Sequence, residues 1–314
     1  MTTLQEFFDP WASRQVWEPT TVIAMPLAVA KCSFRSVRLD KLRRSDVEQW
    51  VKTMDADLAA SAIHTRVNNV RSVLRAAVRD KYLASDPSED VVLPRRRRAS
   101  QAMRVPTPGE VGAVLEAADE WFKAYVLRCA FAGLRLGDAF AVQVGDIASL
   151  ERRLRIRRQV QGAGGQEVRV SPLKYGSERD VYVPDKLTAA LSWHIANVGT
   201  RGDAEWLFTG PNGNPPHGNT IYYWWSKTLA AAGVELFKLH DLRHFFASGL
   251  IAAGCDVVTV QRALGHHSAT VTLSTYAHLW PNAEDRTRVA TAGLMRQVSE
   301  ANAAPVRQSV AEAP

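Results

Sequence analysis

The segment from Leu93 to Pro106 fits neither a regular helix nor a strand, and it divides the chain. It contains Pro94 and Pro106, and four consecutive arginines run from Arg95 to Arg98. Proline fixes φ and removes a backbone donor, and adjacent arginines cannot all enter a core. The 314 residues suffice for two domains at roughly 100–200 residues each. We predict a first domain (1–93), a basic linker (94–106), a second domain (107–298) and a disordered tail (299–314).

The first domain has the apolar spacing of amphipathic helices. Leu4, Phe7, Phe8 and Trp11 follow an i, i+3, i+4, i+7 pattern. Ser45 with Glu48 three residues later predicts a capping box at the start of another helix. The longest helix of this domain is predicted from about 62 to 83.

Positive charge is concentrated in the first third of the chain. The net charge is +7, and residues 1–104 hold 18 Lys and Arg against 12 Asp and Glu. Arg71, Arg75 and Arg79 lie on one face of the long predicted helix, spaced four residues apart. Such a face is either solvated or lies along phosphates, and the run Arg95, Arg96, Arg97 and Arg98 has the same two interpretations.

Cysteine usage and hydropathy indicate neither a disulfide framework nor a membrane segment. Cys32, Cys129 and Cys255 contain no C-x-x-C pair, as expected for reduced thiols without a metal site. The apolar run Val22–Ala30 is short and contains Pro26, so we expect neither a signal peptide nor a membrane span.

The second domain combines helical segments with short alternating ones. Thr107, Pro108 and Glu110 predict a capped helix start. Strands are predicted at 152–160, 168–170 and 181–183, and helices resume from about 187. The expected fold is therefore mainly α with a small antiparallel β-sheet, an α+β fold.

Five side chains of the second domain have the chemistry that phosphodiester cleavage needs. Cleavage requires donors to the phosphate oxygens, an in-line nucleophile and an acid for the leaving oxygen. Arginine matches two phosphate oxygens with its planar fork, and a tyrosine can form a phosphotyrosyl ester. The candidates are Arg135, His240, Arg243, His266 and Tyr276. Each residue alone is more often structural, but together they form a specific pattern.

In this order and spacing, the chain resembles the tyrosine recombinases of the phage integrase family. The resemblance rests on the turn Gly133–Asp138, on H-x-x-R at His240 and Arg243, on L-G-H at 264–266 and on Tyr276. The family's β-hairpin lysine is matched by Lys174. The N-terminal part resembles the helical, SAM-like core-binding domain. The resemblance implies an arm-less integrase of an actinobacterial phage or mobile element.

The resemblance also implies a mechanism. Tyr276 would attack the scissile phosphate to give a 3′-phosphotyrosyl intermediate, and Lys174 would protonate the leaving 5′-oxygen. Arg135 and Arg243 would clamp the phosphate, His240 would assist proton transfer and His266 would bind a non-bridging oxygen. No metal or cofactor is implied.

The implied partner is double-stranded DNA at core attachment sites, bound by a homotetramer on two duplexes. An excision factor or a host architectural protein is a further possible partner. The expected location is the cytoplasm of a bacterial host, on the nucleoid.

Two other functions stay open at this point. A chromosome-dimer-resolving recombinase has a similar two-domain length, although the segment from Thr272 to Tyr276 is more similar to mobile-element integrases. A DNA-binding protein with a decayed site is the second alternative, and the complete set of catalytic residue types argues against it.

Overall fold

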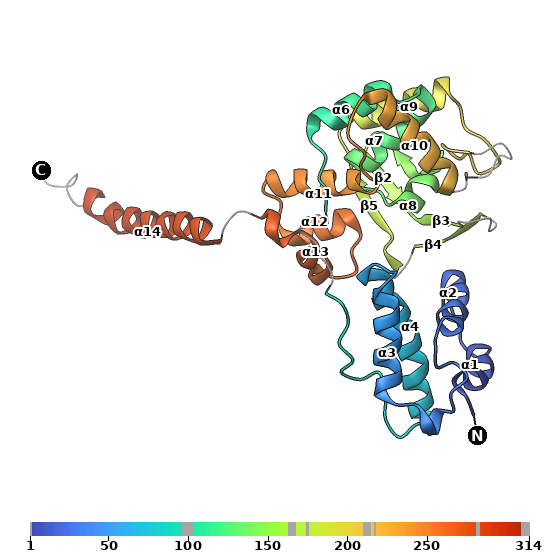
Figure 1. Cartoon of the computed structure of the whole chain (residues 1–314). Coiled ribbons are helices and arrows are strands. Elements are labelled where there is room, and N and C mark those ends of the chain that lie inside the picture. Colours follow the sequence, from blue (N-terminus) through green and yellow to red (C-terminus); the bar gives the residue numbers. More distant parts are fainter. Residues whose placement is uncertain are drawn as a thin grey trace, which may run out of the picture. The chain divides into compact units, whose positions relative to one another are not determined.

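The computed structural model describes the chain except residues 1, 96–102, 163–167, 174–175, 210–214, 217, 281–282 and 309–314. The chain forms two compact units, residues 1–98 and 99–314 (Figure 1).

The N-terminal unit is a set of helices around an aromatic and aliphatic core. Its helices are α1 (Leu4–Ala12), α2 (Pro19–Ala30), the 3₁₀ turn η1 (Leu39–Lys41), α3 (Arg44–Asp55) and α4 (Ala60–Arg79). Thr3 and Glu6 form a capping box on α1, and the buried face of this helix contributes Leu4, Phe7 and Phe8 to the core. The predicted α1 stripe is therefore the core face of the helix.

Two helix boundaries in this unit differ from the predicted ones. The helix predicted to start at Ser45 begins one residue earlier, because Asp46 accepts a hydrogen bond from the backbone of Arg43 at 2.8 Å. This carboxylate satisfies a free N–H of the first turn, the role that the sequence assigned to Glu48. The long helix ends at Arg79, and Lys81 has a left-handed φ of 61°.

The C-terminal unit is mainly helical with two small antiparallel sheets. Its first helices are α6 (Pro108–Ala117), α7 (Glu120–Phe131) and α8 (Leu136–Phe140), followed by the 3₁₀ turn η2 (Val144–Asp146). The strands are β1 (Ile147–Ala148), β2 (Arg153–Ile156), β3 (Arg158–Gln161), β4 (Arg169–Pro172) and β5 (Arg179–Tyr182). The later elements are α9 (Asp185–Asn197), α10 (Gly218–Ala232), α11 (Asp241–Ala252), α12 (Val257–Leu264), α13 (Ala269–Tyr276), η4 (Ala277–Leu279) and α14 (Ala283–Gln308).

Residues 152–160, which the sequence predicted as one strand, form two strands that belong to different sheets. β1, β2 and β5 form one sheet, in which Leu154 pairs with Val181, while β3 and β4 form a separate hairpin. The chain passes from one sheet to the other at Arg157, so residues 152–160 serve two sheets. The predicted α+β class is confirmed.

The core of this unit surrounds α7, whose Phe122 and Tyr125 are buried against residues of the sheet and of α9. The capping box predicted for Thr107 and Glu110 is present at the start of α6. At the other end of the unit, α14 continues to Gln308, whereas the sequence predicted a disordered tail from residue 299. Alanines at 301, 303 and 304 favour helix and explain the difference.

The turn between α7 and α8 requires glycine at position 133. Gly133 has φ +60°, and a Cβ there would clash with the ring of Phe246. Gly133→Ala should lower the free energy of unfolding by more than ~1 kcal/mol, because the left-handed conformation alone costs a residue with a Cβ roughly 1–2 kcal/mol. Urea unfolding followed by tryptophan fluorescence measures the change.

Gly112→Ala is the matched control for this substitution. Gly112 lies inside α6, and a Cβ there meets nothing within 4 Å. This variant should be as stable as the wild type or gain roughly 0.4–1 kcal/mol. Equal stability of the two variants would contradict the requirement for glycine at position 133.

Candidate active site

The five sequence-predicted side chains come from segments that the fold of the C-terminal unit brings together. Arg135 precedes α8, His240 and Arg243 lie at the start of α11, His266 follows α12, and Tyr276 ends α13. Helices α11, α12 and α13 pack side by side (Figure 1). The cluster therefore forms around the end of α12.

Three arginines bind three successive backbone carbonyls at that helix end. Arg179 Nε donates to the carbonyl of Ala263 at 3.1 Å, and Arg243 Nη2 donates to that of Leu264 at 2.6 Å. Arg135 Nη2 donates to the carbonyl of Gly265 at 2.9 Å. The last carbonyls of a helix have no partner within it and carry partial negative charge, so guanidinium groups are well suited to bind them.

A buried carboxylate holds two of these arginines. Asp138 is 1% exposed, and its Oδ2 lies 2.9 Å from Nη2 of Arg179 and 3.8 Å from Nη1 of Arg135. The sequence pattern did not assign a role to Arg179. Asp138, the partner of Arg179, is 41 residues away in the chain, so only the tertiary structure identifies Arg179 as part of the site.

Arg243 is the most enclosed of the three cations. It is 2% exposed, and it also donates to the carbonyl of Gly133. Burial lowers the pKa of Arg243 to about 9, and the nearby Arg135 and Arg179 contribute to the lowering. Three cations thus face one carboxylate, which leaves the site with an excess of positive charge suited to an anion.

His266 is a neutral imidazole beside these arginines. Burial, followed by the charges of Arg243 and Arg135, lowers the pKa of His266 to about 3. Its Nδ1 is 2.9 Å from the hydroxyl of Thr272, which is fully buried. One ring nitrogen is therefore fixed, and Nε2 remains for a ligand.

Tyr276 is buried, and its hydroxyl is hydrogen-bonded to a histidine that the sequence pattern did not select. Tyr276 is 1% exposed and packs with Ala247, Ile251, Val260 and Leu264. Its hydroxyl is 2.8 Å from Nδ1 of His244. Burial raises the pKa of Tyr276, and the charges of Arg243 and Arg135 oppose this, so the phenol is protonated at neutral pH.

The two histidines of α11 stand one helical turn apart. The rings of His240 and His244 meet edge to face, with centroids 5.1 Å apart. Desolvation by the surrounding protein, then the neighbouring His244 and Arg243, lower the pKa of His240 to about 4. The i, i+4 spacing of His240 and His244 was the available signal for the second histidine.

A hollow of about 440 Å³ lies beside His266. It is lined by residues 176–180 before and within β5 and by 261–262 and 265–267 at the end of α12. Lys174 lies outside the described residues, but Gly176, two positions later in the sequence, lines this hollow.

The arginines predicted to bind DNA lie in the N-terminal unit or outside the described residues. Arg71 donates to the carbonyl of Ser88 at 2.7 Å, and Arg75 is 3.5 Å from Asp86. Arg79 and Arg95 are exposed. Arg96, Arg97 and Arg98 lie outside the described residues.

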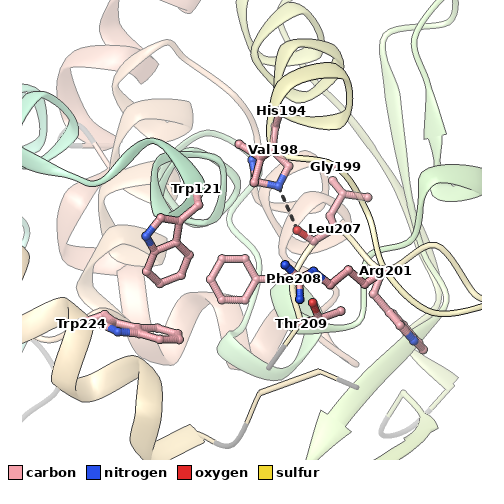
Figure 2. Close-up of a pocket in the computed structure, with 10 residues that line it drawn as sticks. Trp121, His194, Val198, Gly199, Arg201, Leu207, Phe208, Thr209 and Trp224 are labelled. Atoms are coloured by element: carbon pink, nitrogen blue, oxygen red, sulfur yellow. Dashed lines mark hydrogen bonds between the residues drawn. The ribbon is translucent and has the colours of Figure 1, made fainter. Parts of the chain in front are cut away.

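Another pocket, of about 320 Å³, is lined mainly by aromatic and aliphatic side chains (Figure 2). Its aromatic walls are Trp121, Phe208 and Trp224. Nε2 of His194 is hydrogen-bonded to the carbonyl of Leu207 at 2.9 Å. None of the five clustered side chains lines it. His266 and Arg179 line the hollow at the end of α12 instead, so that hollow is the better candidate for phosphate chemistry.

The described part of the chain offers neither a metal site nor a membrane segment. Within it, no three His, Cys, Asp or Glu side chains gather in a way that could hold a metal ion. Over the same residues, every helix is too short or too polar to cross a membrane.

Asp138→Asn should destabilise the C-terminal unit, because Arg179 would keep a buried charge without its counter-charge. Removing one partner of a buried ion pair costs roughly 3–5 kcal/mol. Chemical unfolding gives the value. Lys227→Gln, which removes an exposed ion pair with Asp119, should change stability little. Equal effects of the two changes would contradict the importance of the buried carboxylate.

Comparisons with known proteins identify the family to which the chain belongs. The phage integrase family model matches residues 104–282. The chain is 25% identical over 250 residues to the integrase assigned to prophage phiRv2 of Mycobacterium tuberculosis, an alignment that covers 78% of this chain and 65% of that protein.

Two solved structures share the fold. The Tn1549 transposon integrase in complex with a circular intermediate DNA has a TM-score of 0.78 and 18% identity, with coverage of 94% of this chain and 100% of that one. The lambda integrase tetramer bound to a Holliday junction has a TM-score of 0.67 and 15% identity, with coverage of 86% and 79%. Because the family model matches more than half of its residues, the chain belongs to the phage integrase family.

Proposed function

We propose that the protein is a site-specific DNA recombinase that integrates or excises a phage or mobile element at core attachment sites. The observation that carries the proposal is geometric: Arg135 and Arg243 bind the carbonyls of Gly265 and Leu264, directly before the turn into α13, and α13 ends at Tyr276. A tyrosine held next to phosphate-binding groups suits strand cleavage through a 3′-phosphotyrosyl intermediate.

In this mechanism Tyr276 attacks the scissile phosphorus, and the 5′-oxygen leaves with a proton from Lys174. Arg135 and Arg243 bind the non-bridging oxygens, where negative charge grows in the transition state. Their remaining N–H groups are available because each guanidinium has five donors. Religation reverses these steps, since the phosphotyrosyl ester conserves the energy of the broken bond.

His240 and His266 have supporting roles. A threonine hydroxyl that donates to Nδ1 of His266 leaves the ring proton on Nε2, which then donates to a phosphate oxygen. His240 assists the transfer of the tyrosine proton through its contact with the neighbouring His244.

The N-terminal unit has the charge expected of a DNA clamp. We assign residues 1–93 to a core-binding domain, 94–106 to the linker and 107–298 to the catalytic domain. Arg71, Arg75, Arg79 and Arg95–Arg98 are the proposed backbone contacts, and Arg71 also holds the turn at Ser88.

The working assembly is a homotetramer on two duplexes, since strand exchange needs four active sites. The lambda integrase tetramer on a Holliday junction supports this stoichiometry. Helix α14 exposes Val289, Leu294, Met295 and Val298, which are available to a second copy. The proposed location is the nucleoid in the cytoplasm of a bacterial host, with an excision factor or a host architectural protein as further partners.

Tyr276→Phe should bind DNA without becoming covalently attached to it, because it keeps the ring and loses the nucleophilic oxygen. A nicked suicide substrate carrying the core site, run on a denaturing gel, measures the adduct. Tyr223→Phe, at a side chain that is 69% exposed, is the control and should form adduct at the wild-type rate. An adduct from Tyr276→Phe would assign the nucleophile to another residue.

Replacing Arg95–Arg98 with serine should weaken binding to all DNA sequences about equally. The slope of log K against log salt should fall by up to ~0.9 for each DNA phosphate that the variant no longer neutralises. Replacement of the same four residues with lysine keeps the charge and should keep most of the slope. A serine variant with the wild-type slope would place this run away from the DNA.

A further inference from the structure

The proposed function requires a group that removes the phenolic proton of Tyr276, and the structure offers one at hydrogen-bond distance. Nδ1 of His244 lies 2.8 Å from the tyrosine oxygen. His244 follows Arg243 on the first turns of α11, and its side chain is half-buried. This position lies outside the set that the sequence pattern identified.

The other two histidines of the cluster are less suited to this task. The ring of His266 lies parallel to that of Tyr276, with an interplanar angle of 13° and centroids 6.3 Å apart, and its Nδ1 is already taken by Thr272. His240 contacts His244 rather than the phenol. A general base must reach the proton directly, and His244 does so.

Both partners of this hydrogen bond have the protonation state that the transfer needs. Burial lowers the pKa of His244; the carboxylate of Asp241 opposes this, and Arg243 adds to it. His240 faces the ring from the start of the same helix, and Tyr276, with His266 against it, faces it from the end of α13. The imidazole is therefore neutral above its ordinary pKa of about 6.5, and the phenol keeps its proton.

We propose that His244 is the general base that takes the phenolic proton of Tyr276 during strand cleavage and returns it during religation. The O–H bond of Tyr276 breaks as N–H forms on Nδ1 of His244, while the phenolic oxygen bonds to phosphorus. The P–O5′ bond breaks in the same step, and the leaving oxygen receives its proton from the acid, Lys174. This inference rests on the proposed recombinase function.

The test compares His244→Asn and His244→Ala with wild type in single-turnover cleavage of the suicide substrate. Asparagine can place its side-chain oxygen near the position of Nδ1 and accept the hydrogen bond, but it cannot take the proton. Both variants should lose cleavage by ~10²–10⁴-fold, the usual contribution of a general base. DNA binding and the melting temperature of His244→Asn should match wild type. Wild-type cleavage by His244→Asn would overturn the proposal and assign His244 a structural role.

The pH profile separates base catalysis from positioning, and the profile of the wild type tests the proposal by itself. In wild type, cleavage should rise with pH until the imidazole is neutral, below about pH 6.5, and then stay level. The His244 variants should instead rise through the alkaline range, because the phenol must ionise by itself. A wild-type rate that climbs steadily to about pH 9, towards the range where a phenol ionises, would overturn the proposal.

Three controls accompany this test, and the third distinguishes its failure from failure of the recombinase proposal. Ser248→Ala, one turn further along α11, should cleave at the wild-type rate. A substrate with sulfur in place of the 5′-bridging oxygen needs no acid, so the His244→Asn defect should persist on it, and relief would assign His244 to the leaving group. An adduct formed by Tyr276→Phe would instead overturn the recombinase mechanism itself.

Discussion

The site depends on the C-terminal end of α12, where the carbonyls of Ala263, Leu264 and Gly265 each accept a hydrogen bond from a different arginine. These carbonyls are the negative end of a helix dipole, so they stabilise cations that would otherwise repel one another. Gly265 makes the arrangement possible, because its φ is +64° and a Cβ there would lie 2.8 Å from the side chain of Arg179. One helix end therefore gathers the charges that come from three distant segments.

The same arrangement leaves positive charge unneutralised. Asp138 is the carboxylate that pairs with Arg179 and approaches Arg135, and helix dipoles supply only partial charges. A phosphate diester brings one full negative charge, and a pentacoordinate transition state brings more. The site is therefore more complementary to the transition state than to the resting diester, which is the condition for catalysis. The low pKa of His266 follows from burial and from the same cations, and it keeps that ring neutral as a donor.

The sequence predicted the residues that form the motifs of the family, Arg135 among them, although its partner Gly265 is 130 residues away. His240 and Arg243 share a helix start, and the order of motifs up to Tyr276 predicted a cluster that the fold brings together. The sequence did not identify Arg179 or His244 as site residues, and the cause differs between the two. Arg179 acts through Asp138 and Ala263, contacts that exist only after the sheet and α12 have packed. The partner of His244 is 32 residues away, and no periodicity pairs α11 with the end of α13. The division of residues 152–160 between two sheets likewise depends on strand partners, which alternation alone does not specify.

In the proposed mechanism, the burial of Tyr276 links cleavage to DNA binding. Full burial of a large apolar side chain is worth roughly 1.5–3 kcal/mol, whereas the hydrogen bond to His244 is retained in the proposed proton transfer. Presenting the phenol to a phosphate therefore costs a few kcal/mol, which is small enough for binding to supply. Each charge-assisted hydrogen bond from an arginine to phosphate is worth about 1.5–3 kcal/mol. Those arginines also hold the carbonyls of Leu264 and Gly265, which lead directly into the turn before α13. In the proposed mechanism, a phosphate that binds these arginines acts on the backbone that positions Tyr276, so the tyrosine stays covered until DNA binds.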